Sequence, residues 1–342
     1  MADYILNMGG ADELNYRTNV VNVFKVTKKN VELITDHNLS LSIKRNGLAA
    51  ATCGSYVFAL GGTDAGGGST LDAVDVFKAT ENGVEAVPDH GLTLSQARYS
   101  LTAAAAGNYV LTMGGWAGSN AFSNVVDVFK VTQSGVEAVP DHGLSLSVGR
   151  SNLTAAGCGN YILALGGTIG SAYSNTVDVF KVTENGVEAV PNHGLSLSEA
   201  RSGLRSAVCG NYILAMGGYK GGTPYYSDVV DVFKITENGV EHITDHGLSL
   251  SVARNNFAAA ACGEYVLAMG GSIQASPYKT NVIDVFHVTE NKMEHITDHG
   301  LSLTVVCNEI SAASAGNFIL AMGGYTTSNT VTNAVDIFQI IK

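Results

Sequence analysis

The sequence predicts an all-β fold built from tandem repeats, and three observations support this prediction. A Gly-Gly pair that ends an apolar segment recurs seven times along the 342 residues, at intervals of 51 to 53 residues. The segments between these pairs are short, rich in Val, Ile, Tyr and Phe, and bounded by Gly, Asn or Asp, which is typical of strands rather than helices. Asn-Gly recurs at 82–83, 185–186 and 238–239, which indicates hairpin turns.

Each repeat contains four such segments in a fixed order. The first is rich in small residues, as in 101–107, and the second ends in the Gly-Gly pair, as in 211–218. A variable stretch leads to a third segment such as 125–131, and a short turn leads to a fourth such as 136–147. Four strands per period of about 50 residues are typical of one blade of a β-propeller. The small-residue strand is expected innermost, because neighbouring blades crowd together near the axis.

An Arg stands eight residues after the His of the fourth segment and marks the start of the next blade. The five copies are Arg45, Arg98, Arg150, Arg201 and Arg254, and Cys307 takes this place in the sixth copy. The chain therefore reads as one domain, 1–342, with the repeat units 1–44, 45–97, 98–149, 150–200, 201–253, 254–306 and 307–342.

We expect seven blades, of which the first lacks an innermost strand and the last lacks an outermost one. The alternative is a six-bladed ring closed by residues 308–316. In that ring the hairpin 317–342 would belong to no blade and would expose apolar surface and open strand edges. The incomplete terminal blades also allow oligomerisation by strand exchange between molecules.

The composition excludes several other classes of protein. The 40 Gly residues have no three-residue period, so the chain is not collagen-like, and a hydrophobic content of 46% excludes disorder. A net charge of −11 argues against nucleic-acid binding. No apolar run reaches the roughly 18 residues of a membrane span, and no signal peptide is recognisable. We therefore expect no membrane association and a cytoplasmic location, with secretion left open.

These features resemble those of kelch-repeat propellers, over essentially the whole chain. The matching features are the Gly-Gly pair, the Arg that opens each blade and a third-strand aromatic, namely Phe24, Phe77, Phe129, Phe180, Phe233, Phe286 and Phe338. The chain departs from the family in having Phe for the usual third-strand Tyr, and Val or Met293 for the usual fourth-strand Trp. The resemblance implies a kelch-type β-propeller of four-stranded antiparallel blades. It also implies that the connections between second and third strands stand on the face that binds partners.

Those connections vary most between the repeats and carry most of the aromatic residues outside the repeat pattern. The candidate binding residues are Tyr16, Trp116, Phe122, Tyr173, Tyr219, Tyr225, Tyr226, Tyr278 and Tyr325. Variable loops that bear Tyr and Trp on a rigid scaffold are typical of a recognition surface. The alternative is that these rings fold back onto their own blades.

Two charged residues interrupt the repeat pattern close to the expected axis. Arg205 stands four residues after the repeat Arg, where other copies have Ala, Thr or Ser, and Glu309 stands two residues after Cys307. A charge in this position must be paired or face a watery channel. Each is therefore either a ligand contact or a locally satisfied structural residue. The five repeat Arg residues either tie the blades together or face the mouth of the ring.

Two further repeated features are interpreted as structural rather than as catalytic or metal-binding. Asp-His recurs five times, for example at 141–142, with Asn192-His193 as a sixth, variant copy, and we interpret it as a turn held by the Asp side chain. Equivalent ligand pockets between blades, as in propeller lectins, are the alternative. Four of the five Cys residues share one position at which Ala106 and Ala315 also occur, which indicates small buried side chains.

We therefore expect a non-catalytic recognition or scaffold module that binds a protein partner, or another ligand, through the variable loops of one face. No motif for a phosphate loop, a metal site or a catalytic nucleophile is recognisable, so no catalytic residue, cofactor or metal is expected. One alternative is a multivalent carbohydrate-binding propeller. The other is a kelch-type sugar isomerase with Arg205 and Glu309 at the mouth.

Overall fold

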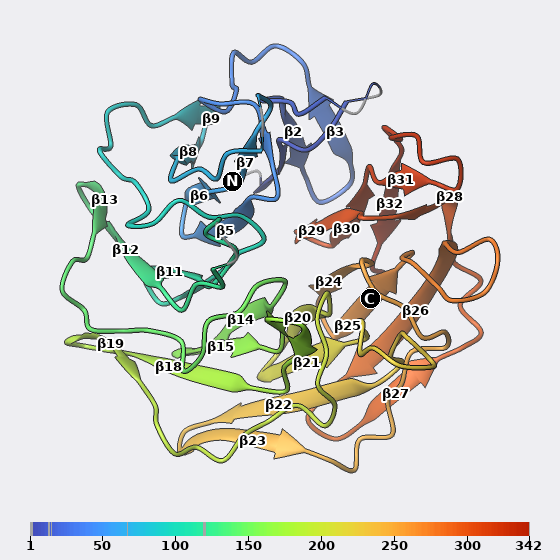
Figure 1. Ribbon diagram of the computed structural model, residues 1–342. Helices are drawn as coiled ribbons and strands as arrows, with labels where there is room; N and C mark the ends of the chain where they lie inside the picture. Colours follow the sequence, from blue (N-terminus) through green and yellow to red (C-terminus); the bar gives the residue numbers. More distant parts are fainter. Residues whose placement is uncertain (1–2, 13, 15, 67, 119–120, 342) are drawn as a thin grey trace.

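The computed structural model describes residues 3–12, 14, 16–66, 68–118 and 121–341. Figure 1 shows seven antiparallel sheets arranged in a ring, so the predicted β-propeller with seven blades is confirmed. The six-bladed alternative is wrong, because β29 (Ser311–Ala315) pairs with β30 (Phe318–Met322) and so belongs to the last hairpin. Across these ranges no helix is long and apolar enough to span a membrane.

Five blades are complete, and their strands run in the order innermost, second, third and outermost. The second blade contains β5 (Ala49–Cys53), β6 (Tyr56–Leu60), β8 (Val74–Thr80) and β9 (Gly83–Ala86). The third contains β10 (Thr102–Ala106), β11 (Tyr109–Met113), β12 (Val126–Thr132) and β13 (Gly135–Ala138). The fourth contains β14 (Thr154–Cys158), β15 (Tyr161–Leu165), β18 (Val177–Thr183) and β19 (Gly186–Ala189). The fifth contains β20 (Arg205–Cys209), β21 (Tyr212–Met216), β22 (Val230–Thr236) and β23 (Gly239–Ile243), and the sixth contains β24 (Ala258–Cys262), β25 (Tyr265–Met269), β26 (Thr280–Val288) and β27 (Met293–Ile296).

The two terminal blades have three strands each, as the repeat pattern predicts. The first contains β1 (Asp3–Met8), β2 (Val21–Val26) and β3 (Val31–Ile34), which correspond to the second, third and outermost strands of a complete blade. The seventh contains β29, β30 and β32 (Val335–Gln339), which correspond to the innermost, second and third strands.

Short additional ladders lie outside the blade sheets. They are β4 (Arg45–Asn46) with β7 (Thr63–Asp64), β16 (Thr168–Ile169) with β17 (Ala172–Tyr173), and β28 (Ser302–Asn308) with β31 (Tyr325–Thr326). Because β28 also pairs with β26, it connects the sixth blade to the seventh.

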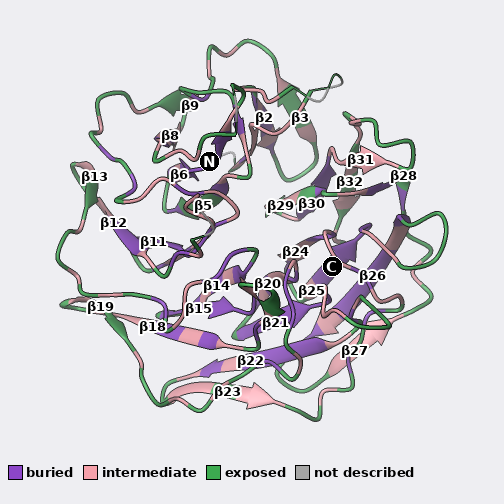
Figure 2. Ribbon diagram, viewed as in Figure 1, coloured by how far each residue is buried: buried purple, intermediate pink, exposed green. Residues whose placement is uncertain are grey.

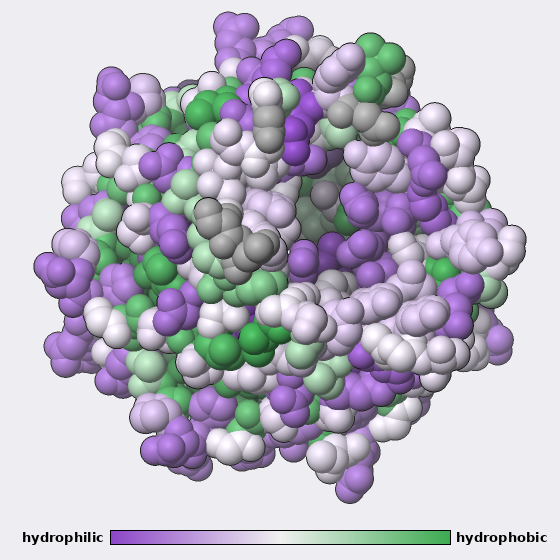
Figure 3. Space-filling view, in the orientation of Figure 1, coloured by the Kyte–Doolittle hydropathy of each residue, from purple (hydrophilic) through white to green (hydrophobic). Residues whose placement is uncertain are grey.

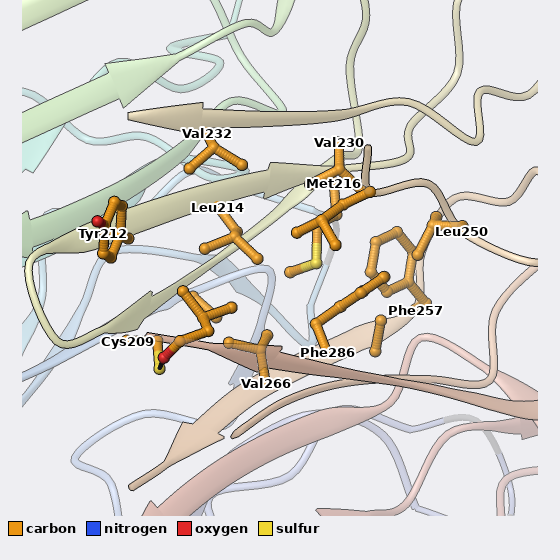
Figure 4. Close-up of a cluster of buried hydrophobic side chains, with 14 residues drawn as sticks. Cys209, Tyr212, Leu214, Met216, Val230, Val232, Leu250, Phe257, Val266 and Phe286 are labelled. Carbon is orange, nitrogen blue, oxygen red and sulfur yellow. Dashed lines mark hydrogen bonds between the residues drawn. The ribbon is translucent and has the colours of Figure 1, made fainter. Parts of the chain in front are cut away.

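The core lies between neighbouring blades. Figure 2 shows that burial is concentrated on the second and third strands, while outermost strands such as β23 are only half-buried. Figure 4 shows one such interface, in which Leu214 and Val232 of the fifth blade pack with Phe286 of the sixth. Apolar residues therefore line both faces of a blade, which explains the low content of charged residues.

The innermost strands pack closely and consist mostly of small residues, with Arg205 and Val208 of β20 as the exceptions. Gly157 on β14 lies against β10, and a Cβ atom at this position would stand 1.8 Å from the carbonyl oxygen of Ala105. The repeated Gly-Gly pair has a related cause. At Gly114 the backbone has a φ of +65°, and a Cβ atom would stand 2.6 Å from the carbonyl oxygen of Arg150.

Candidate functional site

The repeat Arg residues lie inside the framework and not at the mouth of the ring. Each is completely buried and forms an ion pair with an Asp of the third strand of the same blade. The Arg Nη2 and Asp Oδ2 atoms are 2.6 Å apart for Arg45 and Asp75 and for Arg150 and Asp178. The other pairs are Arg98 with Asp127, Arg201 with Asp231, and Arg254 with Asp284. These Asp partners are not among the predicted site residues, although each recurs in the sequence as the Asp of an Asp-Val-Phe segment.

The repeated Asp-His pair forms the predicted turn, but the hydrogen bond is accepted by the imidazole of the His and not by the carboxylate of the Asp. In all six copies the Nδ1 atom of the His accepts a hydrogen bond from the backbone N–H of the Leu two residues later, as His142 does from Leu144 at 3.0 Å. The preceding Asp141 adopts a positive φ of 54°. Six copies of one structural turn account for this repeated motif.

Four of the candidate aromatic residues form one group, which we call the tyrosine cluster: Tyr173, Tyr219, Tyr225 and Tyr226. The ring of Tyr219 is central, with centroid distances of 5.2 Å to Tyr173 and 5.7 Å to Tyr226, both edge-on. Tyr225 stacks on Tyr219 at 6.1 Å with an interplanar angle of 1°. The cluster thus joins the loops of the fourth and fifth blades into one aromatic surface.

Polar contacts hold the loop that carries three of these tyrosines. The Nζ atom of Lys220 lies 2.7 Å from Oε1 of Glu199, and the hydroxyl of Ser227 donates to Oε2 of Glu199 at 2.6 Å. Burial acts to raise the pKa of Glu199, but the hydrogen bonds from Lys220 and Ser227 outweigh it, so this pKa is lowered. The backbone N–H of Tyr225 donates to Gln274 of the sixth blade at 3.1 Å. The cluster is therefore fixed by contacts from three consecutive blades.

The phenol groups of Tyr173 and Tyr226 stay protonated at neutral pH. Burial and the neighbouring Tyr219 raise the pKa of Tyr173 and of Tyr226. Tyr225 is the most accessible member, with 44% of its surface exposed. The cluster therefore offers a partly exposed aromatic surface.

The other candidate aromatics lie apart from this cluster. Trp116 and Phe122 pack edge-on against each other within the loop of the third blade, with a centroid distance of 4.8 Å. Tyr16 and Tyr278 are 67% and 66% exposed, on the first and sixth blades. Tyr325 lines a cavity at the seventh blade. The structure therefore brings four of the nine predicted aromatic residues into one group and pairs two others, Trp116 and Phe122, within their own loop.

A cavity of about 970 Å³ lies between the first and seventh blades. Figure 3 shows the corresponding hollow on the face viewed, between the N-terminal and C-terminal parts of the ring. Its lining includes Asn46, Tyr99 and Glu309, and Asn46 accepts hydrogen bonds of 2.8 Å from Arg17 and from Thr63. The sequence marks Glu309 and Tyr325 as candidates but not Asn46 or Tyr99.

The two irregular charges lie near the axis but do not form an ion pair with each other. Arg205 lines a second cavity beside β1, and its Nη1 atom donates to the carbonyl oxygen of Leu204 at 3.2 Å. Burial lowers the pKa of Arg205, and the charge of Glu309 opposes this shift. Glu309 itself is exposed, with a φ of 55°. Glu309 therefore acts on Arg205 through space without direct contact.

The comparisons with known proteins agree with this architecture. The Kelch motif family model matches residues 149–192, which cover most of one repeat unit. The solved structure of YjhT is similar in fold, with a TM-score of 0.60 and 12% identity, over 88% of this chain and 96% of that one. This likeness concerns the fold alone. No curated protein matches the chain in sequence.

Proposed function

The chain is a kelch-repeat β-propeller, and we propose that it acts as a non-catalytic recognition module that binds a protein partner through the tyrosine cluster. The fold is consistent with a binding module. The observation that supports this particular site is the convergence of Tyr173, Tyr219, Tyr225 and Tyr226 from two blades into one partly exposed surface.

The chemistry of the cluster suits a protein surface. Tyrosine offers a large apolar ring and a hydroxyl group while losing little side-chain entropy on binding, and for this reason it is enriched among the residues that dominate interface energies. The rings of the cluster already contact each other, so a partner would order few additional side chains. Tyr225, at 44% exposure, is the member expected to contact the partner most extensively.

The test begins with peptides selected from a displayed library of random twelve-residue sequences, by binding to the immobilised wild-type chain. The affinity of the enriched peptides is then measured for the wild type, Tyr225→Ala, Tyr225→Phe and Tyr16→Ala. We expect Tyr225→Ala to weaken binding about thirtyfold, which corresponds to about 2 kcal/mol. Tyr225→Phe keeps the ring and should retain most of the affinity.

Tyr16→Ala is the matched control, because Tyr16 is an exposed tyrosine of the first blade and lies outside the cluster. Equal affinities for Tyr225→Ala and Tyr16→Ala would overturn the proposal. Binding of simple glycans by all four proteins, with no enriched peptide, would favour the lectin alternative. Conversion of a sugar substrate that is lost in Arg205→Ala would favour the isomerase alternative.

A further inference from the structure

The strand β1 lacks the cover that its counterparts have. In β11, β15, β21 and β30 every residue is buried, whereas in β1 only Ile5 is buried. In the described part of the chain β1 pairs with β2 alone, so its other edge is open. Leu6 and Met8 of this strand are only partly buried. An open strand edge beside apolar side chains is a template for pairing with another strand.

The open edge faces a cavity that lies where an innermost strand belongs. The innermost strands pack side by side from β5 through β10, β14, β20 and β24 to β29, and β29 then contacts β1. A cavity of about 560 Å³ lies between β1, β5 and β29. Its lining includes Leu6, Met8, Leu48, Ala51, Ile310 and Ala313. We call this cavity, together with the open edge of β1, the seam.

We propose that the seam binds an extended segment of a partner protein, which adds to β1 as an antiparallel strand with small, uncharged side chains. This surface is separate from the tyrosine cluster and does not depend on the function proposed above. The main-chain groups of β1 would provide the hydrogen bonds, and the interface between blades would continue through the added strand.

The neighbouring strands determine the side chains that fit. The six innermost strands consist almost entirely of Ala, Ser, Thr, Gly and Cys, as in Thr102–Ala106. The 1.8 Å approach that a Cβ atom of Gly157 would make to Ala105 shows how little space separates such strands. A strand with large side chains would collide with the seventh or the second blade. The partner segment must therefore carry small residues on both of its faces.

The charges at the seam indicate that the segment differs from the chain's own repeats. In five blades the Arg before the innermost strand pairs with an Asp of the third strand. In the first blade Asn22 occupies the place of that Asp on β2. An Arg brought in by the segment would be buried without a carboxylate, which is unfavourable. Arg205 is the only charged residue among the described residues that line the cavity, and its guanidinium already donates to the carbonyl oxygen of Leu204, so an uncharged strand adds no further charge that needs a partner.

The test uses a fluorescent nine-residue peptide with the sequence of residues 99–107, which lacks the repeat Arg, and the complete chain. Fluorescence anisotropy measures its affinity. Two further peptides carry one N-methyl group, at the position of Ala103 or of Ala104. An added innermost strand bonds β1 with alternate N–H groups and turns the others toward the channel. We therefore expect one methylated peptide to bind at least tenfold more weakly and the other to bind within about twofold of the parent.

Hydrogen exchange locates the bound peptide. We expect slower exchange of the amides of residues 4–8 when the peptide is present, and unchanged exchange in β6, which already has an innermost neighbour. A peptide with Phe at the positions of Ala103 and Ala105 should bind at least tenfold more weakly. Tyr225→Ala should leave the affinity for the peptide unchanged, so the two proposals can fail separately.

Four results would each overturn the proposal. They are absence of binding by the parent peptide, equal affinities of the two methylated peptides, undiminished binding of the Phe-containing peptide, and unchanged exchange in β1. Slowing of exchange in β1 with rising protein concentration, without peptide, would also overturn it, because a second copy of the chain would then occupy the seam.

Discussion

Arg150 is completely buried at the start of the fourth blade, and its Nη2 atom lies 2.6 Å from Oδ2 of Asp178 on the third strand of that blade. The other carboxylate oxygen of Asp178 accepts a hydrogen bond of 3.0 Å from the backbone N–H of Ser147, in the segment that arrives from the preceding blade. One carboxylate therefore neutralises the charge of Arg150 and also fixes the connection between two blades.

We predict that Asp178→Asn lowers the free energy of unfolding by about 3–5 kcal/mol, because it leaves the buried guanidinium without a counter-charge. Chemical denaturation followed by tryptophan fluorescence or circular dichroism measures this change. The chain itself offers a matched control in Asp336 of the seventh blade, where Cys307 replaces the Arg. Asp336→Asn should change the stability by less than about 1 kcal/mol, since no buried cation depends on it. Similar losses in the two variants would contradict this account of the pair.

The packing of the innermost strands leads to a second prediction. Gly157→Ala should destabilise the protein by about 1–3 kcal/mol, because the new Cβ atom must displace the β10 backbone at Ala105. Ala261→Gly changes the equivalent residue of the sixth blade in the opposite direction and should cost no more than about 1 kcal/mol. Thermal unfolding of both variants gives the comparison. A Gly157→Ala protein as stable as the wild type would show that the strands are less tightly packed than described.

The histidine turns predict a dependence of stability on pH. Burial lowers the pKa of His90, His142 and His246, each of which accepts a backbone hydrogen bond through Nδ1. The folded state thus binds protons less readily than the unfolded state, in which the pKa is about 6.5. The stabilisation is complete above that pH and is lost as the pH falls below it. Loss of each hydrogen bond costs about 1 kcal/mol.

The triple variant His90→Asn, His142→Asn, His246→Asn separates this effect from other titrations. Asn provides an acceptor oxygen close to the position of Nδ1 but does not titrate. Urea denaturation between about pH 7.5 and 5.5 should show a smaller loss of stability for the triple variant than for the wild type. Parallel pH profiles for the two proteins would refute the assignment to these histidines.

The cysteine residues should be unreactive in the folded protein. All five are buried, and burial raises the pKa of Cys209 and of Cys307 to about 11. Since the thiolate is the reactive form, a disulfide reagent at about pH 8 should modify the native chain slowly and all five thiols quickly after unfolding. A single fast thiol in the native protein would instead indicate an activated nucleophile.

Much of the fold follows from the repeats, because the same strand signals occur in register along the chain. The seven blades and the incomplete terminal blades are predictable for this reason. The partner of each repeat Arg was not predicted, because Asp178 and its counterparts recur as regularly as the apolar residues around them. One informative exception is the first blade, which lacks the Arg and has Asn22 in place of the Asp, whereas the seventh blade keeps Asp336 although Cys307 replaces its Arg.

The tyrosine cluster could be predicted only in part. The sequence marks the loop aromatics as candidates, but their mutual contact depends on how loops of neighbouring blades approach each other. The ring of Tyr173 passes so close to Gly221 that a Cβ atom there would stand 2.7 Å from it. Trp116 instead packs on Phe122 of its own loop. Contacts between loops of different repeats cannot be predicted from the repeat pattern of the sequence.

The most direct test of the proposed recognition function is the number of ligand molecules bound per chain. Isothermal titration of a selected peptide into the wild type and into Tyr225→Ala measures this number together with the affinity. We predict one peptide per chain, with an affinity that falls about thirtyfold in Tyr225→Ala. A stoichiometry close to the number of blades, or an affinity unaffected by this substitution, would contradict the account.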